Sequence, residues 1–385
     1  MTDTRLDAEL RREVYRQRFA SYLVNEYIKP TAQELSRSIP RILSDYDFPD
    51  VSRREVNQVN AAIRQLFNER WSGMWESIRD ELRELGIHEA EALQELYSDL
   101  SGKDVTKPAG EVLIGAMNAA AMTLVSGERV DAGVWDKFIR KNNTATYNLI
   151  DGVIRIGQQE GMTNQEITRE IRGSYNRSTK SYQGGILQGR ATQWAETLAR
   201  TGVSHYANTA RERTIQANSD ILERRILVAT HDNRTTFICR SRHLQEWPVD
   251  DDNYPRLPFH FNERSVYLFL FPGEKSLDGT VPAIGGKATS AKDYRERPRY
   301  RGRRDSGIYD VEQVSANVSQ SQWLKRQPRA FVRSALGDTR AKLFLDGKLD
   351  IDSFVDMQGR PLTLNELRQT TAGERAFRRA GLTGE

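Results

Sequence analysis

The spacing of apolar residues in the first half of this chain is that of an α-helix. Between residues 56 and 85 they recur at steps of three and four, which places them on one helical face: Val56, Val59, Ile63, Leu66, Phe67, Trp71, Met74, Ile78, Leu82 and Leu85. Similar patterns predict helices over residues 110–127 and 134–161. We expect an elongated helical N-terminal region over residues 1–220, whose apolar faces are offered to partner proteins.

Signals for a helix break and a restart follow. Gly161 interrupts the pattern, and Thr163 with Glu166 fits a capping box, in which each side chain bonds the backbone N–H of the other residue. A helix is therefore predicted to begin there. The polar, glycine-rich stretch 173–185 is expected to be a loop, and the alanine-rich residues 191–218 return to helical periodicity.

The pattern changes after residue 220. Short runs of β-branched and aliphatic residues at 223–232, 246–249 and 265–271 predict three strands, and turn-forming residues lie between them. We expect a small module over residues 221–278. The predicted fold class is mainly α with a small α+β module, in which short antiparallel strands lie around residues 224–272.

Two further segments complete the chain. Residues 279–310 are expected to form an exposed loop or linker, and residues 311–385 a helical C-terminal tail. One apolar face of that tail is predicted to contain Leu324, Phe331, Leu336, Leu343 and Phe344.

The linker carries six arginines within ten residues, interleaved with tyrosine, at Arg295, Arg297, Arg299, Arg301, Arg303 and Arg304. Arginine pairs with phosphates and tyrosine stacks on bases, so the run is a candidate contact to nucleic acid. A solvated loop or a contact to an acidic protein is the favoured interpretation, because nearby acidic residues dilute the charge.

Composition narrows the classes of protein that remain. The 385 residues are 38% hydrophobic and 29% charged, with a mean hydropathy of −0.67, as expected of an elongated chain that completes its burial against partners. The net charge of +4 permits contact with nucleic acid without requiring it. The single cysteine excludes an internal disulfide, and no apolar run approaches the roughly 20 residues that span a bilayer. We expect a soluble protein made in a reducing compartment.

The stretch from Ala229 to Ser265 contains the only cysteine and three of the five histidines of the chain. A structural zinc usually takes four ligands from two closely spaced pairs, and Cys239 has no cysteine partner. His243 or His260 could act as base to a nucleophilic Cys239, but no third residue stands out to orient them. A buried, unreactive cysteine is the favoured interpretation.

The same stretch resembles the head morphogenesis, or minor capsid, family of tailed bacteriophages, typified by the F protein of Mu-like phages. In that family a helical region leads into D-x-R-T-C-P-x-C, an acidic turn with proline, and P-x-H-x-N-C-R. The residues that match this signature are Asp232, Arg234, Thr235, Cys239, Pro258, His260, Asn262 and Arg264, and they follow a helix with Ala199–Thr201. We assign Phe237 to the position of the first cysteine and Glu263 to that of the last.

The C-terminal stretch QWLKRQPRAFVRSALGDTRAKLFLDG is similar to the tail of Mu-type members, so the resemblance covers about residues 191–367. It implies a virion structural protein, a minor head protein with several copies per particle. This protein would bind the portal and the major capsid protein at or near the portal vertex. Its roles would be in head assembly and in DNA packaging or ejection, with contact to packaged DNA. Its place would be the virion head, and the host cytoplasm during assembly.

The resemblance implies neither an enzyme nor a cofactor. It argues against zinc, because two of the four cysteine or histidine ligands of the family pattern are absent. Two other functions stay open. One is a metal-dependent nuclease or cysteine hydrolase centred on Cys239, His243 and His260, and the other is a DNA-binding protein that uses the run Arg295–Arg304.

Overall fold

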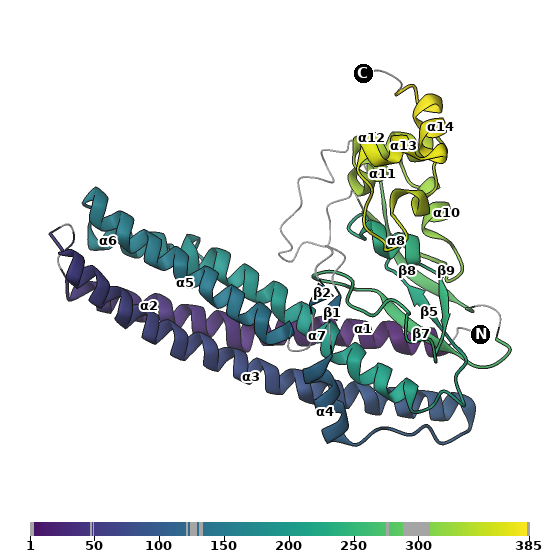
Figure 1. The fold of residues 1–385 in the computed structure, drawn as a ribbon, viewed down its shortest axis with the longest axis horizontal. Coiled ribbons are helices and arrows are strands. Elements are labelled where there is room, and N and C mark those ends of the chain that lie inside the picture. The colour runs from purple at the N-terminus through teal and green to yellow at the C-terminus, as the bar shows by residue number, and fades with distance from the viewer. Residues whose placement is uncertain are drawn as a thin grey trace.

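The protein consists of a long helical arm and a mixed lobe of strands and short helices (Figure 1). It is mainly helical, with a small set of antiparallel strands, as the sequence predicted. This computed structural model describes residues 4–46, 48, 50–120, 122–123, 129–130, 134–274, 277–287 and 309–382.

The helices of the arm pack along one another, and α3 contacts α2, α4, α5 and α7. Their bounds are α1 (Thr4–Leu23), the π-helical turn η1 (Val24–Ile28), α2 (Lys29–Ser44), α3 (Arg53–Ser101), α4 (Gly110–Ala119), α5 (Val134–Glu160), α6 (Asn164–Arg172), the π-helical turn η2 (Ile186–Ala191) and α7 (Thr192–Gln216).

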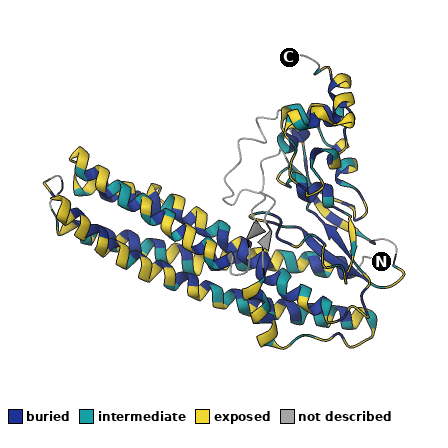
Figure 2. Cartoon of the chain, in the orientation of Figure 1, coloured by how far each residue is buried: buried dark blue, intermediate teal, exposed yellow. Residues whose placement is uncertain are grey.

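Helix α3 contains the predicted apolar stripe and extends beyond it in both directions. A capping box of Ser52 and Glu55 begins the helix, and Gly102, with φ of 65°, ends it. The expectation that the stripe is offered to a partner was wrong. Of its ten side chains all but Leu66 are buried, because the neighbouring helices of the same chain cover them (Figure 2).

The predicted break between α5 and α6 is confirmed. Helix α5 ends at Glu160, Gly161 adopts φ of 67°, and Thr163 and Glu166 form the capping box that begins α6. Left-handed backbone is open to glycine at little cost, which is why the break falls there.

Two local predictions were wrong. The helix expected over residues 110–127 ends at Ala119, and the short strands β1 (Met122–Thr123) and β2 (Arg129–Val130) follow it. Thr123 in β1 is β-branched, a residue type that favours strand over helix, which is consistent with the early end. The stretch expected to be a loop after α6 instead contains a hairpin of β3 (Ser174–Asn176) and β4 (Ser181–Gln183).

Side-chain contacts explain that hairpin. Asn176 Oδ1 accepts hydrogen bonds from the backbone of Ser178 and Thr179, which closes the turn. Tyr175 and Tyr182 face each other across the strands, with ring centres 5.2 Å apart.

The three strands predicted in the lobe are confirmed as one antiparallel sheet of order β6–β5–β7. They are β5 (Arg224–Val228), β6 (Glu246–Pro248) and β7 (Val266–Leu270), and the helix α8 (Phe237–Arg242) lies between the first two in sequence.

The segment 279–310 was expected to be an exposed loop or linker, but its ends are strands. β8 (Thr280–Gly286) pairs with β9 (Tyr309–Ser315) over seven residues, and Ile284 N–H bonds the carbonyl of His231 just after β5. The arginine run Arg295–Arg304 lies outside the described residues.

The predicted helical C-terminal tail is confirmed except at its start, where residues 311–315 belong to β9. Its helices are α10 (Gln320–Lys325), α11 (Arg329–Leu336), α12 (Asp338–Leu345), the 3₁₀ turn η3 (Ile351–Phe354), α13 (Leu364–Gln369) and α14 (Thr371–Arg379). The predicted apolar face is also confirmed, since all five of its side chains are buried in one core. That core includes side chains of β5, β7, β8 and β9, so the strands and the C-terminal helices form one lobe.

Helix α1 joins the arm to the lobe. Arg5 donates to the carbonyl of Phe269 at 3.0 Å and pairs with Glu274 at 2.7 Å, and Leu6 belongs to the core of the lobe. None of the helices in the described ranges combines the length and the apolar character that crossing a bilayer requires.

Candidate functional site

The residues of the sequence signature meet in one place, between the end of β5 and the loop that precedes β7. Asp232 is buried, and its carboxylate accepts two hydrogen bonds from Arg264, at 2.7 and 3.1 Å. The same carboxylate accepts from the backbone of Arg234 and from the backbone and hydroxyl of Thr235, each at 2.9 Å. Asp232 therefore connects the two halves of the signature.

These partners stabilise the ionised form of Asp232. Burial disfavours the carboxylate, but the hydrogen bonds and the charge of Arg264, together with Thr235, outweigh burial and lower the pKa of Asp232 to about 2. Arg240 adds a second layer, since it donates to the carbonyls of Asp232 and Thr235 and to Gln320 of α10. Burial lowers the pKa of Arg240 to about 10, which leaves it charged at neutral pH.

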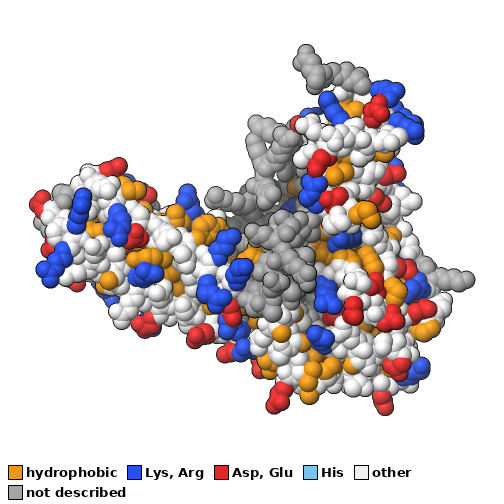
Figure 3. Space-filling model, in the orientation of Figure 1, with side chains coloured by type: hydrophobic (Ala, Val, Ile, Leu, Met, Phe, Trp, Pro, Cys, Tyr) orange, Lys and Arg blue, Asp and Glu red, His pale blue; other side chains and the backbone are white. Residues whose placement is uncertain are grey.

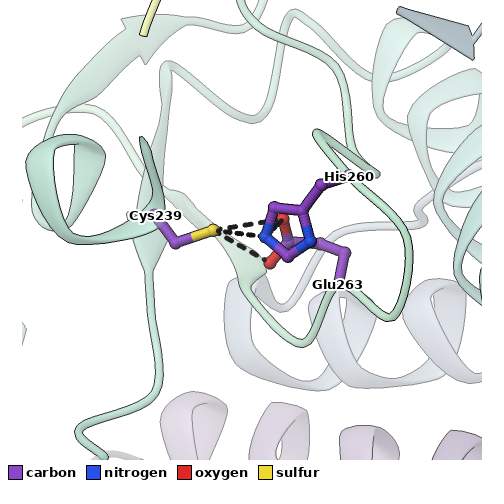
Figure 4. A group of neighbouring side chains, drawn as sticks. All are labelled: Cys239, His260 and Glu263. Carbon is purple, nitrogen blue, oxygen red and sulfur yellow. Dashed lines mark hydrogen bonds and ion pairs between the residues drawn. The ribbon is translucent and has the colours of Figure 1, made fainter. Parts of the chain in front are cut away.

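Beside this network lie Thr236, Cys239, His260 and Glu263. Cys239 Sγ is 3.0 Å from His260 Nε2 and 3.2 and 3.4 Å from the two carboxylate oxygens of Glu263 (Figure 4). His260 Nε2 is 3.0 Å from Glu263 Oε2, and the hydroxyl of Thr236 lies 2.9 Å from the same nitrogen and 3.0 Å from the sulfur. We call these four residues the cysteine cluster.

The position assigned to the first cysteine of the family pattern needs a correction. Counting from Asp232 to Cys239 along D-x-R-T-C-P-x-C gives Thr236, and the geometry agrees, because Thr236 faces Cys239 and His260. Phe237 packs elsewhere, against Phe354, with ring centres 5.7 Å apart. All four positions that carry cysteine or histidine in the family pattern are therefore in contact here.

A pocket of about 740 Å³ opens onto the cysteine cluster. Helices α1 and α7 form one wall through residues such as Arg16 and Arg200, and the signature loops form the other. Burial, and then the charge of Glu263, raise the pKa of the Cys239 thiol, which favours the neutral thiol over a nucleophilic thiolate. His260 is the most exposed of the three groups in Figure 4, with 26% of its side chain accessible.

The remaining signature residues build the loop before β7. Asn262 adopts φ of 60°, a conformation that asparagine tolerates well, and its N–H donates to Thr201 of α7 at 3.3 Å. Pro258 is buried in the same loop. The helix segment Ala199–Thr201, which belongs to the resemblance, therefore touches the signature directly.

His243, a candidate catalytic base from the sequence, does not reach Cys239. Its Nδ1 accepts from the backbone N–H of Ala229 and its Nε2 bonds the carbonyl of Val318, each at 3.1 Å. His231 lies edge-on against the His243 ring, with ring centres 4.8 Å apart. Both histidines are buried parts of the lobe, and the three residues Cys239, His243 and His260 do not form one site.

The buried ring of His243 makes stability depend on pH. Burial lowers its pKa to about 4, from 6.5 in an exposed histidine. The unfolded chain therefore binds more protons below pH 6.5, so the stability that neutral His243 contributes is present above that pH and is lost as the pH falls toward 4. From about pH 7.5 to about pH 5 this residue should lower the free energy of unfolding by about 2 kcal/mol.

Urea unfolding at the two pH values measures the effect. The His243→Asn variant should show a pH difference smaller by about 2 kcal/mol than the unsubstituted chain. The control His88→Asn, at a side chain that is 53% exposed, should keep the full difference. An equal pH dependence in all three chains would contradict the role given to His243.

Sequence reasoning missed two features of the site. It took Glu263 as a lost ligand, although its carboxylate is buried within the cysteine cluster, and it overlooked Thr236. The only signal for both was the alignment with the family pattern. Asp250, Asp251 and Asp252 form a turn at the surface, and Asp251 bonds the backbone of Asn253.

Comparisons of this chain with protein families, with curated proteins and with solved structures found no match.

Proposed function

We propose that this chain is a minor head protein of a tailed bacteriophage, which binds at or near the portal vertex and acts in head assembly and in DNA packaging or ejection. One observation supports this most: seven of the eight signature residues, all except Pro258, hydrogen-bond to one another or to Thr201 of α7, although the signature is spread over 33 positions from Asp232 to Arg264. A chance match of scattered letters has no reason to converge in space.

The second resembling segment supports the same proposal. Trp323, in the stretch WLKRQP, is buried with its ring centre 5.2 Å from that of His231, next to Asp232. Gln320, three residues before Trp323, accepts a hydrogen bond at 2.8 Å from Arg240, which also donates to the carbonyls of the signature residues Asp232 and Thr235. The two segments that resemble the family are thus packed together in one lobe, as parts of one functional unit would be.

The shape of the chain suits a binding role. Helix α3 has 49 residues, which corresponds to about 74 Å at 1.5 Å per residue, so the arm can reach well beyond the lobe. Acidic and basic side chains are interspersed over the face seen in Figure 3. Because the apolar stripe of α3 is buried, contact with the portal or the major capsid protein would use this mixed polar surface and single exposed aromatics such as Tyr175 and Trp194.

Mass spectrometry of purified particles and of portal-containing assembly intermediates tests the proposal. The chain should be present in both, in several copies for each portal ring, and crosslinking should connect it to the portal protein. Particles from a phage in which the gene is interrupted should form in reduced yield or without infectivity. Absence of the chain from both particles and intermediates would refute the proposal.

A further inference from the structure

The cysteine cluster has the composition of a metal site. A thiol, an imidazole and a carboxylate come from two separate segments, α8 and the loop before β7, and their ligand atoms all lie within 4.8 Å of one another (Figure 4). Zinc is commonly held by these three donor types in proteins. The thiol disfavours magnesium and calcium, which prefer oxygen ligands.

The outer bonds of the cluster orient its donor atoms inward. His260 Nδ1 lies 2.8 Å from the carbonyl of Phe261, so that nitrogen carries the hydrogen and Nε2 turns its lone pair toward Cys239 and Glu263. Glu263 Oε1 accepts from the backbone N–H groups of Arg264 and Ser265, at 3.0 and 2.9 Å. Metal-bound histidines and carboxylates are typically fixed by bonds of this kind.

Charge balance also favours a cation. Glu263 is buried, and within the described part of the chain no lysine or arginine forms an ion pair with it. The adjacent Arg264 pairs with Asp232 instead. A divalent cation bound by one thiolate and one carboxylate leaves no net charge, which offsets the cost of burying a carboxylate that has no direct lysine or arginine partner.

We propose that Cys239, His260 and Glu263 bind a zinc ion, with a water from the adjoining pocket as the fourth ligand. Zinc bonds of about 2.0–2.3 Å in a tetrahedron place ligand atoms about 3.3–3.6 Å apart. The present separations of 3.0–3.4 Å therefore need to widen by only a few tenths of an ångström. Binding releases the thiol proton to solvent.

This proposal departs from the sequence expectation, in which the two missing cysteines argue against zinc. Glu263 supplies a ligand where the family pattern has its last cysteine, and Thr236 places a hydroxyl where the pattern has its first. Only the Thr236 position has lost its ligand sulfur without a replacement of comparable strength. The zinc ion would link α8 to the loop before β7. Zinc binding at this site is independent of the proposed role of the chain in a phage head.

The decisive experiment uses the full, untagged chain after removal of metal with a chelator. Zinc titration followed by elemental analysis should give about one zinc ion per chain, with a rise in the thermal unfolding midpoint. Cobalt in place of zinc should produce the near-ultraviolet absorption of a thiolate–cobalt bond. In Cys239→Ser this absorption should vanish and zinc affinity should fall at least about tenfold.

A gain of binding avoids variants that merely fail to fold. Thr236→Cys places a sulfur beside Cys239 Sγ and His260 Nε2, so zinc affinity should rise at least about tenfold and cobalt should show two thiolate bonds. The control Ser178→Cys adds a cysteine in the exposed turn between β3 and β4. It should change neither the zinc affinity nor the number of thiolate–cobalt bonds. Equal zinc binding in the unsubstituted chain and in Cys239→Ser, or no gain in Thr236→Cys, would overturn the proposal.

Discussion

Replacement of Glu89 by alanine should reduce the free energy of unfolding by about 3–5 kcal/mol. The Glu89 side chain is fully buried in α3 and pairs with Arg12 at 2.6 Å and Arg16 at 2.8 Å, both from α1, and with Arg211 of α7 at 3.5 Å. Burial opposes the charge of Glu89, but the three arginines outweigh it and lower its pKa. Without the carboxylate, Arg12 and the buried Arg16 lose their closest acidic partner, whereas Arg211 keeps its pair with Glu9.

Urea unfolding of the variant, followed by circular dichroism, measures this loss. A matched control is Glu91→Ala on the same helix, since Glu91 pairs with Lys107 at 2.7 Å but is 44% exposed. That variant should lose less than about 1 kcal/mol. If both variants lose the same amount, the buried pairs do not hold α1, α3 and α7 together.

Replacement of Asp232 by alanine should also reduce the free energy of unfolding by about 3–5 kcal/mol, because it removes the acceptor shared by Arg264 and Thr235. Since the pKa of Asp232 is about 2, the part of this contribution that depends on its charge is present at neutral pH and is lost only as the pH falls from about 4 toward 2. The same unfolding measurement at pH 7 applies.

A second bidentate ion pair in the lobe provides the comparison. Asp346 accepts two bonds from Arg329, at 2.6 and 2.9 Å, but its side chain is 34% exposed, whereas that of Asp232 is 2% exposed. Asp346→Ala should lose less than about 1 kcal/mol. A loss at Asp232 as small as that at Asp346 would mean that the signature network contributes little to stability.

Local signals in the sequence predicted much of this fold. The stripe from Val56 to Leu85, the capping box at Thr163 and the three strands each depend on residues close together in the chain. Those local signals could not predict which strands pair when the strands lie far apart in the sequence. The β8–β9 hairpin joins residues on either side of a long charged segment, and nothing in a single sequence specified that register.

The candidate site was also predicted only in part. The resemblance to the family pattern indicates Asp232, Cys239 and His260 as site residues from the sequence alone. His243 was a second candidate base, and it lies four residues after Cys239, a spacing that shares a face only within a helix. Helix α8 ends at Arg242, so the backbone of His243 is extended and its ring turns into the lobe, toward Ala229 and Val318.

The attachment of α1 to the lobe sets an order of events during synthesis. Arg5 bonds the carbonyl of Phe269, 264 residues later in the chain. At roughly 5–20 residues per second, the ribosome needs about 13–50 s to supply that partner after Arg5 has been made. Throughout this interval the buried face of α1 has no lobe to dock on. Docking of the start of α1 on the lobe can therefore follow only after β7 has emerged from the ribosome.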